Sequence, residues 1–331
     1  MKNRQIQIID STLRDGNHTV KNQFNLEDIK TIVGKLDKLG ADYIEVGYGF
    51  GIGSFNKEGY ATDEQIIETA LKAANKSKIA ILVFPDKANL DLYKKILTSD
   101  LGLVRIAVQA CNVDPAKEYI KLAKEKNIEV GGFMMMASRL NPDEIVNEAI
   151  KLKEFGADSI TITDSAGAMD PSRVRKVVGE VKNKTKLKIG FHTHDNLGLA
   201  VGNSMIAVES GADFVDTAIA GLGAGAGNTR TELMVATLLK EGYQVNLDMF
   251  EAISSVKTLR QIIKKYGTDV KDMGDLILIG YYGIYSAFIS LVNKLTEKYK
   301  VSKKELIEQI ANRGFVPGDE EKIEKLAKSL Q

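Results

Sequence analysis

Short runs rich in β-branched and aromatic residues alternate with longer amphipathic segments as far as about Gly242, and this regular alternation constrains the fold most. The runs that we predict to be strands are Gln5–Ser11, Tyr43–Gly47, Ile79–Phe84, Val104–Val108, Glu129–Met135, Ser159–Thr163, Lys188–His194 and Phe214–Ile219. Helical periodicity marks segments between them, such as Leu26–Leu39, Thr62–Ala74, Pro142–Phe155 and Pro171–Lys182. Eight strand–helix pairs predict an α/β protein with the architecture of a (β/α)8 TIM barrel.

The ends of these predicted helices carry typical capping residues. Asn25 precedes and Gly40 follows the first helix, while Asn141 and Pro142 stand at the start of a later one. A doubly wound open sheet is the competing arrangement, but it usually has fewer strands and a glycine-rich turn after the first strand. Here the first strand is followed by STLRDGNH, which favours the barrel.

Strand-like runs stop near Gln244, and the rest of the chain shows helical periodicity only. The sequence therefore predicts a barrel domain over residues 1–243 and an all-helical C-terminal segment over residues 244–331. The helices expected in this segment are Asn246–Lys265, Tyr282–Tyr299, Ser302–Asn312 and Asp319–Ser329. Because no long linker precedes them, we expect them to pack on the barrel.

Composition excludes several classes of protein. The 331 residues carry a formal net charge of +1, so no excess charge points to nucleic acid or to an anionic membrane. Cys111 is the only cysteine, which excludes a disulfide framework and a cysteine-rich zinc site. The N-terminus lacks the apolar run of a secretory signal, and no later apolar run approaches the ~18 residues of a membrane span. We expect a soluble, cytoplasmic protein.

The three histidines are the sharpest indication of chemistry. His18, His192 and His194 all fall at or just after the predicted C-terminal ends of strands, which form the active-site face of a barrel. His192 and His194 are two residues apart on one strand, so their imidazoles point the same way. Asp15 follows the first strand, and one carboxylate with two imidazoles leaves open positions for a metal that binds substrate directly. Histidines at this spacing on a strand are also common without a metal.

Four motifs make the chain resemble the DRE-TIM metallolyases. They are TLRDG (Thr12–Gly16), IEVG (Ile44–Gly47), FHTHDN (Phe191–Asn196) and GLGAGAGN (Gly221–Asn228). Within that superfamily the chain is most similar to the 4-hydroxy-2-oxovalerate aldolases. GSFN (Gly53–Asn56), GYYGIYSAF (Gly280–Phe288) and the C-terminal sequence from KYKVSKK onward resemble their signatures. The likeness extends over nearly the whole chain, including the helical segment.

The resemblance implies roles for particular residues. Asp15, His192 and His194 would hold a divalent metal, with Mn²⁺ favoured over Mg²⁺ and Co²⁺. Arg14 would contact the pyruvate moiety and steady an enolate, and His192 would also face the substrate. His18 would be the general base that accepts the proton of the 4-hydroxyl group. Arg14 could also be no more than an ion-pair partner of Asp15.

Four further residues complete the site that the resemblance implies. Tyr285 would lie close to His18 at the substrate entrance, and Ser165 would help to bind the pyruvate carboxylate. Glu45 and Asn228 would line the metal side of the pocket as supporting groups or occasional ligands. The glycines between Gly221 and Gly227 would serve the site or simply make a tight turn.

The expected activity is cleavage of a 4-hydroxy-2-oxo acid to pyruvate and an aldehyde by a class II, metal-dependent carbon–carbon lyase. One alternative is a Claisen-type acyl-CoA synthase of the isopropylmalate or citramalate synthase type. However, these enzymes carry GERAGN-like segments where this chain has Ala224, Gly225 and Ala226. The other alternative is a non-catalytic binding barrel. The resemblance also implies an acylating aldehyde dehydrogenase as partner, and a homo- or hetero-oligomer.

The chain departs from the aldolase pattern in three places. Tyr48–Gly51 stands where an HGDG stretch is usual, Asp195 stands in place of a third histidine, and Val108–Gln109 replaces Thr–His. None of these changes touches the metal ligands, the base or the arginine. They leave open the aldehyde half of the substrate.

Overall fold

Eight parallel strands form a closed barrel in sequential order, which confirms the predicted (β/α)8 fold. The computed structural model describes residues 4–268, 279 and 282–331. The strands are β1 (Gln7–Asp10), β2 (Tyr43–Val46), β3 (Lys78–Val83), β4 (Leu103–Gln109), β5 (Val130–Met135), β6 (Ser159–Asp164), β7 (Lys188–Thr193) and β8 (Phe214–Thr217). Strand β8 pairs with both β1 and β7, so only one strand separates the strand before Asp15 from the strand of the paired histidines.

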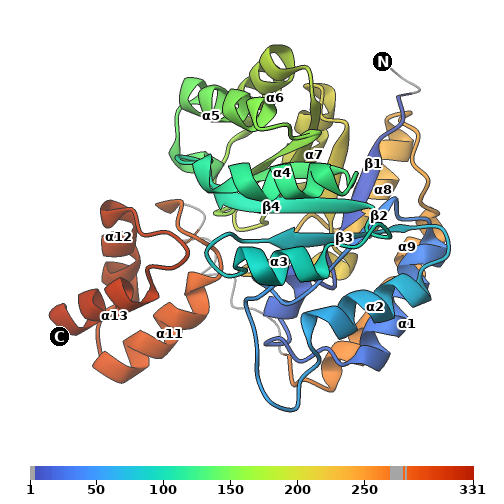
Figure 1. The fold of residues 1–331 in the computed structure, drawn as a ribbon. Coiled ribbons are helices and arrows are strands. Elements are labelled where there is room, and N and C mark those ends of the chain that lie inside the picture. Colours follow the sequence, from blue (N-terminus) through green and yellow to red (C-terminus); the bar gives the residue numbers. More distant parts are fainter. Residues whose placement is uncertain (1–3, 269–278, 280–281) are drawn as a thin grey trace.

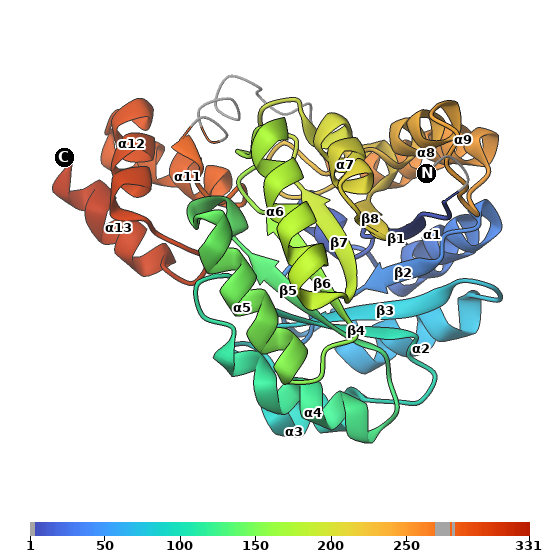
Figure 2. The same cartoon turned by 90° about the horizontal axis from the view of Figure 1, so that it is seen from above.

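Nine helices of the described chain surround these strands (Figures 1 and 2). They are α1 (Leu26–Leu39), α2 (Asp63–Ala73), α3 (Leu90–Ile96), α4 (Lys117–Glu125), α5 (Pro142–Glu154), α6 (Pro171–Thr185), α7 (Ala200–Glu209), α8 (Thr231–Lys240) and α9 (Met249–Lys264). The predicted caps are confirmed: the side chain of Asn25 accepts from Asp28 N, Asn141 forms a capping box with Glu144, and Gly40 ends α1 in the left-handed conformation. These caps satisfy backbone groups that the helix itself leaves unpaired.

Apolar residues fill two layers of the barrel. Most buried aliphatic side chains lie between the strands and the surrounding helices. Val104 on β4 belongs to this outer core. A smaller cluster occupies the interior towards the carboxyl ends of β3–β5 and contains Leu82, Phe84, Phe133 and Met135. Because side chains alternate between the two faces of a strand, the interior positions are the ones that can face a bound substrate.

A second group of helices lies beside the barrel (Figure 1). Helices α11 (Phe288–Tyr299), α12 (Lys303–Arg313) and α13 (Glu320–Ser329) pack on one another around their own apolar core. Met136, which follows β5, joins this core from the barrel. Helix α9 instead packs against α1 and α8. The division at residue 243/244 stays a prediction.

The helix expected over Tyr282–Tyr299 begins only at Phe288. The preceding turn is held to the barrel, because Ser286 donates from its backbone N (3.2 Å) and its Oγ (2.9 Å) to the carbonyl oxygen of Ser165. Gly283 in this turn has a φ of +66°, which a helix does not accommodate. These contacts fix Tyr285 against the barrel face. Gly280 and Tyr281, the first two residues of the GYYGIYSAF motif, lie outside the described residues.

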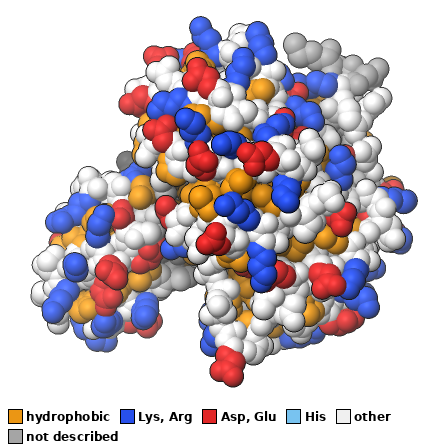
Figure 3. All heavy atoms as spheres, in the orientation of Figure 1, with side chains coloured by type: hydrophobic (Ala, Val, Ile, Leu, Met, Phe, Trp, Pro, Cys, Tyr) orange, Lys and Arg blue, Asp and Glu red, His pale blue; other side chains and the backbone are white. Residues whose placement is uncertain are grey.

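Basic and acidic side chains are interspersed on the face that Figure 3 shows, so neither charge predominates on this face. Among the residues that the structure describes, no helix combines the length and the apolar character that crossing a membrane requires.

Candidate metal centre and substrate pocket

Asp15 begins a short 3-10 helix (Asp15–His18), the next element after β1, and is only 3% exposed. Its Oδ1 accepts from Arg14 Nη1 at 2.7 Å, and its Oδ2 accepts from Asn228 Nδ2 at 2.7 Å and from Ala224 N at 3.1 Å. Burial would raise the pKa of this carboxyl, but the charges of Arg14 and the nearby histidines hold it well below its usual range. Asp15 is therefore an anion at neutral pH.

His192 and His194 are oriented by their Nδ1 atoms. His192 Nδ1 lies 2.9 Å from Asp216 Oδ2, and His194 Nδ1 lies 3.2 Å from the carbonyl oxygen of Ala224. Carboxylate and carbonyl oxygens accept hydrogen bonds, so each Nδ1 carries a hydrogen and Nε2 is the ring nitrogen left to bind a metal ion. Burial lowers the pKa of His194 to about 3, which keeps this imidazole neutral. His194 is thus in the form that binds a metal ion.

The three side chains converge: Asp15, His192 and His194 each offer a ligand atom, and these atoms lie within 4.8 Å of one another. All three are buried, and carboxylate with imidazole is a donor set for divalent transition metals. Asn228 Oδ1 is also buried and has no hydrogen-bond partner among the described residues. The residues present therefore fit a divalent cation, with room for ligands from a substrate.

Gly223 makes this close packing feasible. A Cβ at this position would lie 2.6 Å from Asp15 Oδ2 and 2.2 Å from Asn228 Nδ2. No side chain fits at these distances without moving the carboxylate or the amide. The glycine-rich segment therefore does more than turn the chain, because Gly223 lets the backbone approach the candidate ligand.

Arg14 lies next to the candidate metal centre and is 4% exposed. Its Nε donates to Glu45 Oε2 at 2.6 Å and its Nη1 to Asp15, so the ion pair with Asp15 does form. Nη2 is buried and has no hydrogen-bond partner among the described residues. A fixed guanidinium with an uncommitted Nη2 amino group is suited to bind an anionic oxygen beside the candidate metal centre. Glu45 itself contacts arginines and not the candidate ligands.

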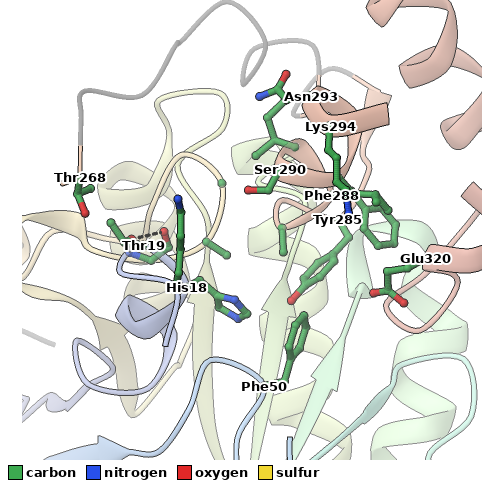
Figure 4. Close-up of a pocket in the computed structure, with 17 residues that line it drawn as sticks. His18, Thr19, Phe50, Thr268, Tyr285, Phe288, Ser290, Asn293, Lys294 and Glu320 are labelled. Atoms are coloured by element: carbon green, nitrogen blue, oxygen red, sulfur yellow. Dashed lines mark hydrogen bonds between the residues drawn. The ribbon is translucent and has the colours of Figure 1, made fainter. Parts of the chain in front are cut away.

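His18 and Tyr285 line one pocket with a volume of about 580 Å³ (Figure 4). Phe50 lies beside both, with ring centroids 4.6 Å from His18 and 6.2 Å from Tyr285. Gly49 brings the chain against the His18 ring, since a Cβ there would lie 2.6 Å from His18 Cε1. Burial raises the pKa of Tyr285, so its hydroxyl keeps its proton.

The pocket lies between the barrel and the C-terminal helices. Its walls come from the segment that begins at His18, from the glycine-rich segment and from α11. Phe288, Ser290 and Lys294 of α11 appear above His18 in Figure 4. Ala224 connects it with the metal centre, because its backbone contacts both Asp15 and His194. A substrate entering here would meet His18 and Tyr285 before the metal ligands.

Ser165 lies directly after β6 and is buried. Its Oγ accepts from Met136 N at 3.1 Å, and its carbonyl oxygen holds Ser286. No hydrogen bond donated by this hydroxyl is found among the residues that the structure describes, and the binding role of Ser165 stays a prediction. Asp195, which replaces a third histidine, accepts from the backbone N of Ala200, the first residue of α7, at 2.9 Å.

Sequence reasoning missed the residues that orient the histidines. Asp216 lies on β8 and receives His192, while the carbonyl oxygen of Ala224 receives His194. Arg105, on β4, contacts Asp216 in turn. The sequence could have indicated Asp216, because it is an aspartate near the end of a predicted strand. It could not have indicated the carbonyl oxygen of Ala224, because every residue has a backbone carbonyl.

Two family models cover the chain. An HMGL-like model matches residues 5–259, and a DmpG-like communication domain matches residues 270–331. Together with the barrel and its Asp-His-His cluster, these matches define the class: the chain belongs to the HMGL-like family of carbon–carbon lyases.

The curated relatives indicate one group of enzymes within this family. The chain is 37% identical over 326 residues to 4-hydroxy-2-oxovalerate aldolase of Pelotomaculum thermopropionicum, covering 98% of this chain and 95% of the relative. The aldolase of the same name from Thermomicrobium roseum is 38% identical over 96% of this chain and 89% of its own length. Within the HMGL-like family, the chain therefore belongs with the 4-hydroxy-2-oxovalerate aldolases, and the resemblance seen in its motifs is confirmed.

Solved structures share the fold. The carboxyl transferase domain of Rhizobium etli pyruvate carboxylase, solved with pyruvate and biocytin, superposes with a TM-score of 0.83 at 17% identity. That match covers 99% of this chain and 60% of the other chain. An N-terminal domain from Bacteroides vulgatus gives a TM-score of 0.74 at 26% identity, over 89% of this chain and 98% of the other.

Proposed function

We propose that this chain is a class II, divalent-metal-dependent aldolase that cleaves a 4-hydroxy-2-oxo acid, such as 4-hydroxy-2-oxovalerate, to pyruvate and an aldehyde. The observation that carries the proposal is the buried cluster of Asp15, His192 and His194 with the uncommitted Nη2 of Arg14 beside it. Relatives that bear the name of this activity match nearly the full chain.

The roles of the residues follow from the bond that breaks. Cleavage between C3 and C4 leaves an electron pair on the pyruvate fragment, and this charge delocalises onto the 2-oxo oxygen as an enolate. A divalent cation held by Asp15, His192 and His194 supplies Lewis-acid stabilisation of that oxygen when it is bound. Arg14 adds a fixed positive charge that needs no reorganisation during the reaction.

His18 accepts the proton of the 4-hydroxyl group as the C4–O bond becomes the carbonyl of the aldehyde. Its position beside Tyr285 in the pocket supports this role, with the aldehyde half of the substrate bound on that side in this proposal. Ser165 donates to the pyruvate carboxylate from the end of β6. Proton return to C3 of the enolate then completes pyruvate.

The preferred ion in this proposal is Mn²⁺, with Mg²⁺ and Co²⁺ as weaker substitutes. One carboxylate with two neutral imidazoles suits a borderline ion better than a hard one, because imidazole favours transition metals over Mg²⁺. The purified chain is expected to release pyruvate from 4-hydroxy-2-oxovalerate, to lose this activity after chelation, and to regain it best with Mn²⁺. Coupled reduction of the pyruvate by lactate dehydrogenase measures the rate. Full cleavage by a metal-free preparation would contradict the proposal.

We also propose that the C-terminal helices bind an acylating aldehyde dehydrogenase, in a hetero-oligomer that passes the aldehyde between two active sites. Support comes from the DmpG-like communication domain over residues 270–331 and from the pocket that α11 forms above His18. An aldehyde leaving the site through this pocket would contact the C-terminal helices first.

The partner proposal predicts that the untagged chain co-purifies from its source with an aldehyde dehydrogenase, in a complex larger than either protein alone. Sizing of the complex followed by mass spectrometry of its subunits measures this. A chain that elutes only as a homo-oligomer would contradict the partner and leave the aldolase reaction unaffected.

A further inference from the structure

Arg105 is a fully buried arginine in the barrel interior that the proposed reaction does not use directly. It lies on β4 with 0% of its surface exposed. Its Nη1 is 2.6 Å from Asp216 Oδ2, and its Nε and Nη2 are 2.8 and 2.6 Å from Glu45 Oε1. Its guanidinium also lies over the ring of Phe133, 4.8 Å from the centroid. One cation thus links two carboxylates, one on β2 and one on β8, the two strands that flank β1.

Hydrogen bonds connect each of these carboxylates to a candidate metal ligand, directly or through Arg14. On one side, the Asp216 oxygen that binds Arg105 is also the oxygen that receives His192 Nδ1 at 2.9 Å. On the other side, the second oxygen of Glu45 binds Arg14, and Arg14 binds Asp15. The two routes from Arg105 therefore end on His192 and Asp15.

The geometry requires a residue with a forked guanidinium at this position. Two carboxylates buried side by side repel each other and lose their hydration, so they need a shared cation. Arginine binds both at once through separate N–H groups, whereas lysine presents a single compact charge. Without this bridge, Asp216 would lose the contact that fixes the oxygen facing His192. The imidazole would then lose its orientation and its ability to aim Nε2.

We propose that Arg105 is a positioning residue that sets the metal affinity of the site by fixing Asp216 behind His192 and Glu45 behind Arg14. The inference rests on the metal centre of the proposed function and deepens it. Arg105 touches neither the metal nor the substrate in this arrangement. It acts through two carboxylates, so its loss reduces metal affinity before it affects any chemical step.

Binding of Mn²⁺ alone to the metal-free full-length protein tests the inference. Titration calorimetry is expected to show roughly 10- to 100-fold weaker binding for Arg105→Met than for the wild type, the usual cost of losing an outer-shell partner. Arg105→Lys keeps the charge without the fork, so its affinity is expected to lie between the two. Circular dichroism of each metal-free protein establishes that it is folded.

Val104→Ala is the matched control. Val104 precedes Arg105 on β4, is equally buried, and belongs to the core between strands and helices. It is expected to lower thermal stability and to leave Mn²⁺ affinity unchanged. Asp216→Asn tests the route: if Arg105 acts through Asp216, Arg105→Met weakens Mn²⁺ binding less in the Asp216→Asn protein than in the wild type.

Wild-type Mn²⁺ affinity in folded Arg105→Met, or in folded Arg105→Lys if the first variant does not fold, would overturn the inference. An equal loss in Val104→Ala would also overturn it, because a general effect of packing would then explain the result. Failure of the proposed function looks different. In that case wild-type protein binds Mn²⁺ but does not cleave 4-hydroxy-2-oxo acids, and the binding measurements still decide the role of Arg105.

Discussion

His194→Ala and His192→Ala are each expected to abolish metal-dependent cleavage, because each removes one of three candidate protein ligands from a buried site. Metal stabilisation of developing charge contributes several kcal/mol to the barrier, so its loss lowers kcat/KM by roughly 10³-fold or more. His192→Ala also leaves Asp216 buried without the hydrogen bond from Nδ1. Both rates and the bound Mn²⁺ per chain, measured after dialysis, are expected to fall together.

Thr193→Ser is the control for both substitutions. Thr193 lies between the two histidines on β7, and alternation along the strand places its side chain on the other face. It is buried like its neighbours, so the variant experiences the same environment without losing a ligand. We expect Mn²⁺ content and cleavage within a few-fold of the wild type. If His194→Ala kept both its metal and its activity, the ligand assignment would be wrong.

The barrel follows from the sequence because its signals are local. Buried strands and capped helices can be predicted from short stretches of sequence, as Asn25 and Gly40 show for α1. The candidate ligands are similarly visible, since alternation on one strand brings His192 and His194 to one face. The histidines lie close to Asp15 because β8 pairs with both β7 and β1 and so closes the barrel between them.

The orientation of these ligands depends instead on contacts between distant segments. Asp216 is 24 residues from His192 and reaches it because β7 and β8 are neighbours. Arg105 reaches Asp216 across 111 residues through the barrel interior, which no local pattern encodes. The late start of α11 also depends on contacts between distant segments. The hydrogen bonds of Ser286 to Ser165 compensate for the turn that interrupts the helix.

Substitutions of Arg14 and His18 are expected to separate two parts of the reaction. Exchange of the C3 protons of pyruvate with solvent needs only the enolate, whereas cleavage also needs removal of the 4-hydroxyl proton. Arg14→Ala therefore slows both reactions, by roughly 10²- to 10³-fold, since it removes a preorganised positive charge. His18→Ala slows cleavage by roughly 10²- to 10⁴-fold and leaves exchange much closer to the wild-type rate.

Deuterium incorporation into pyruvate, followed by NMR, measures exchange, and the coupled assay measures cleavage in the same Mn²⁺-loaded preparations. Lys294→Ala is the control, because Lys294 lines the same pocket from α11 but is exposed and lies away from the barrel ligands. It should change neither rate by more than a few-fold. A His18→Ala protein that cleaves at the wild-type rate would exclude His18 as the base. The Tyr285 hydroxyl, which lines the pocket beside it, would then be the next group to substitute.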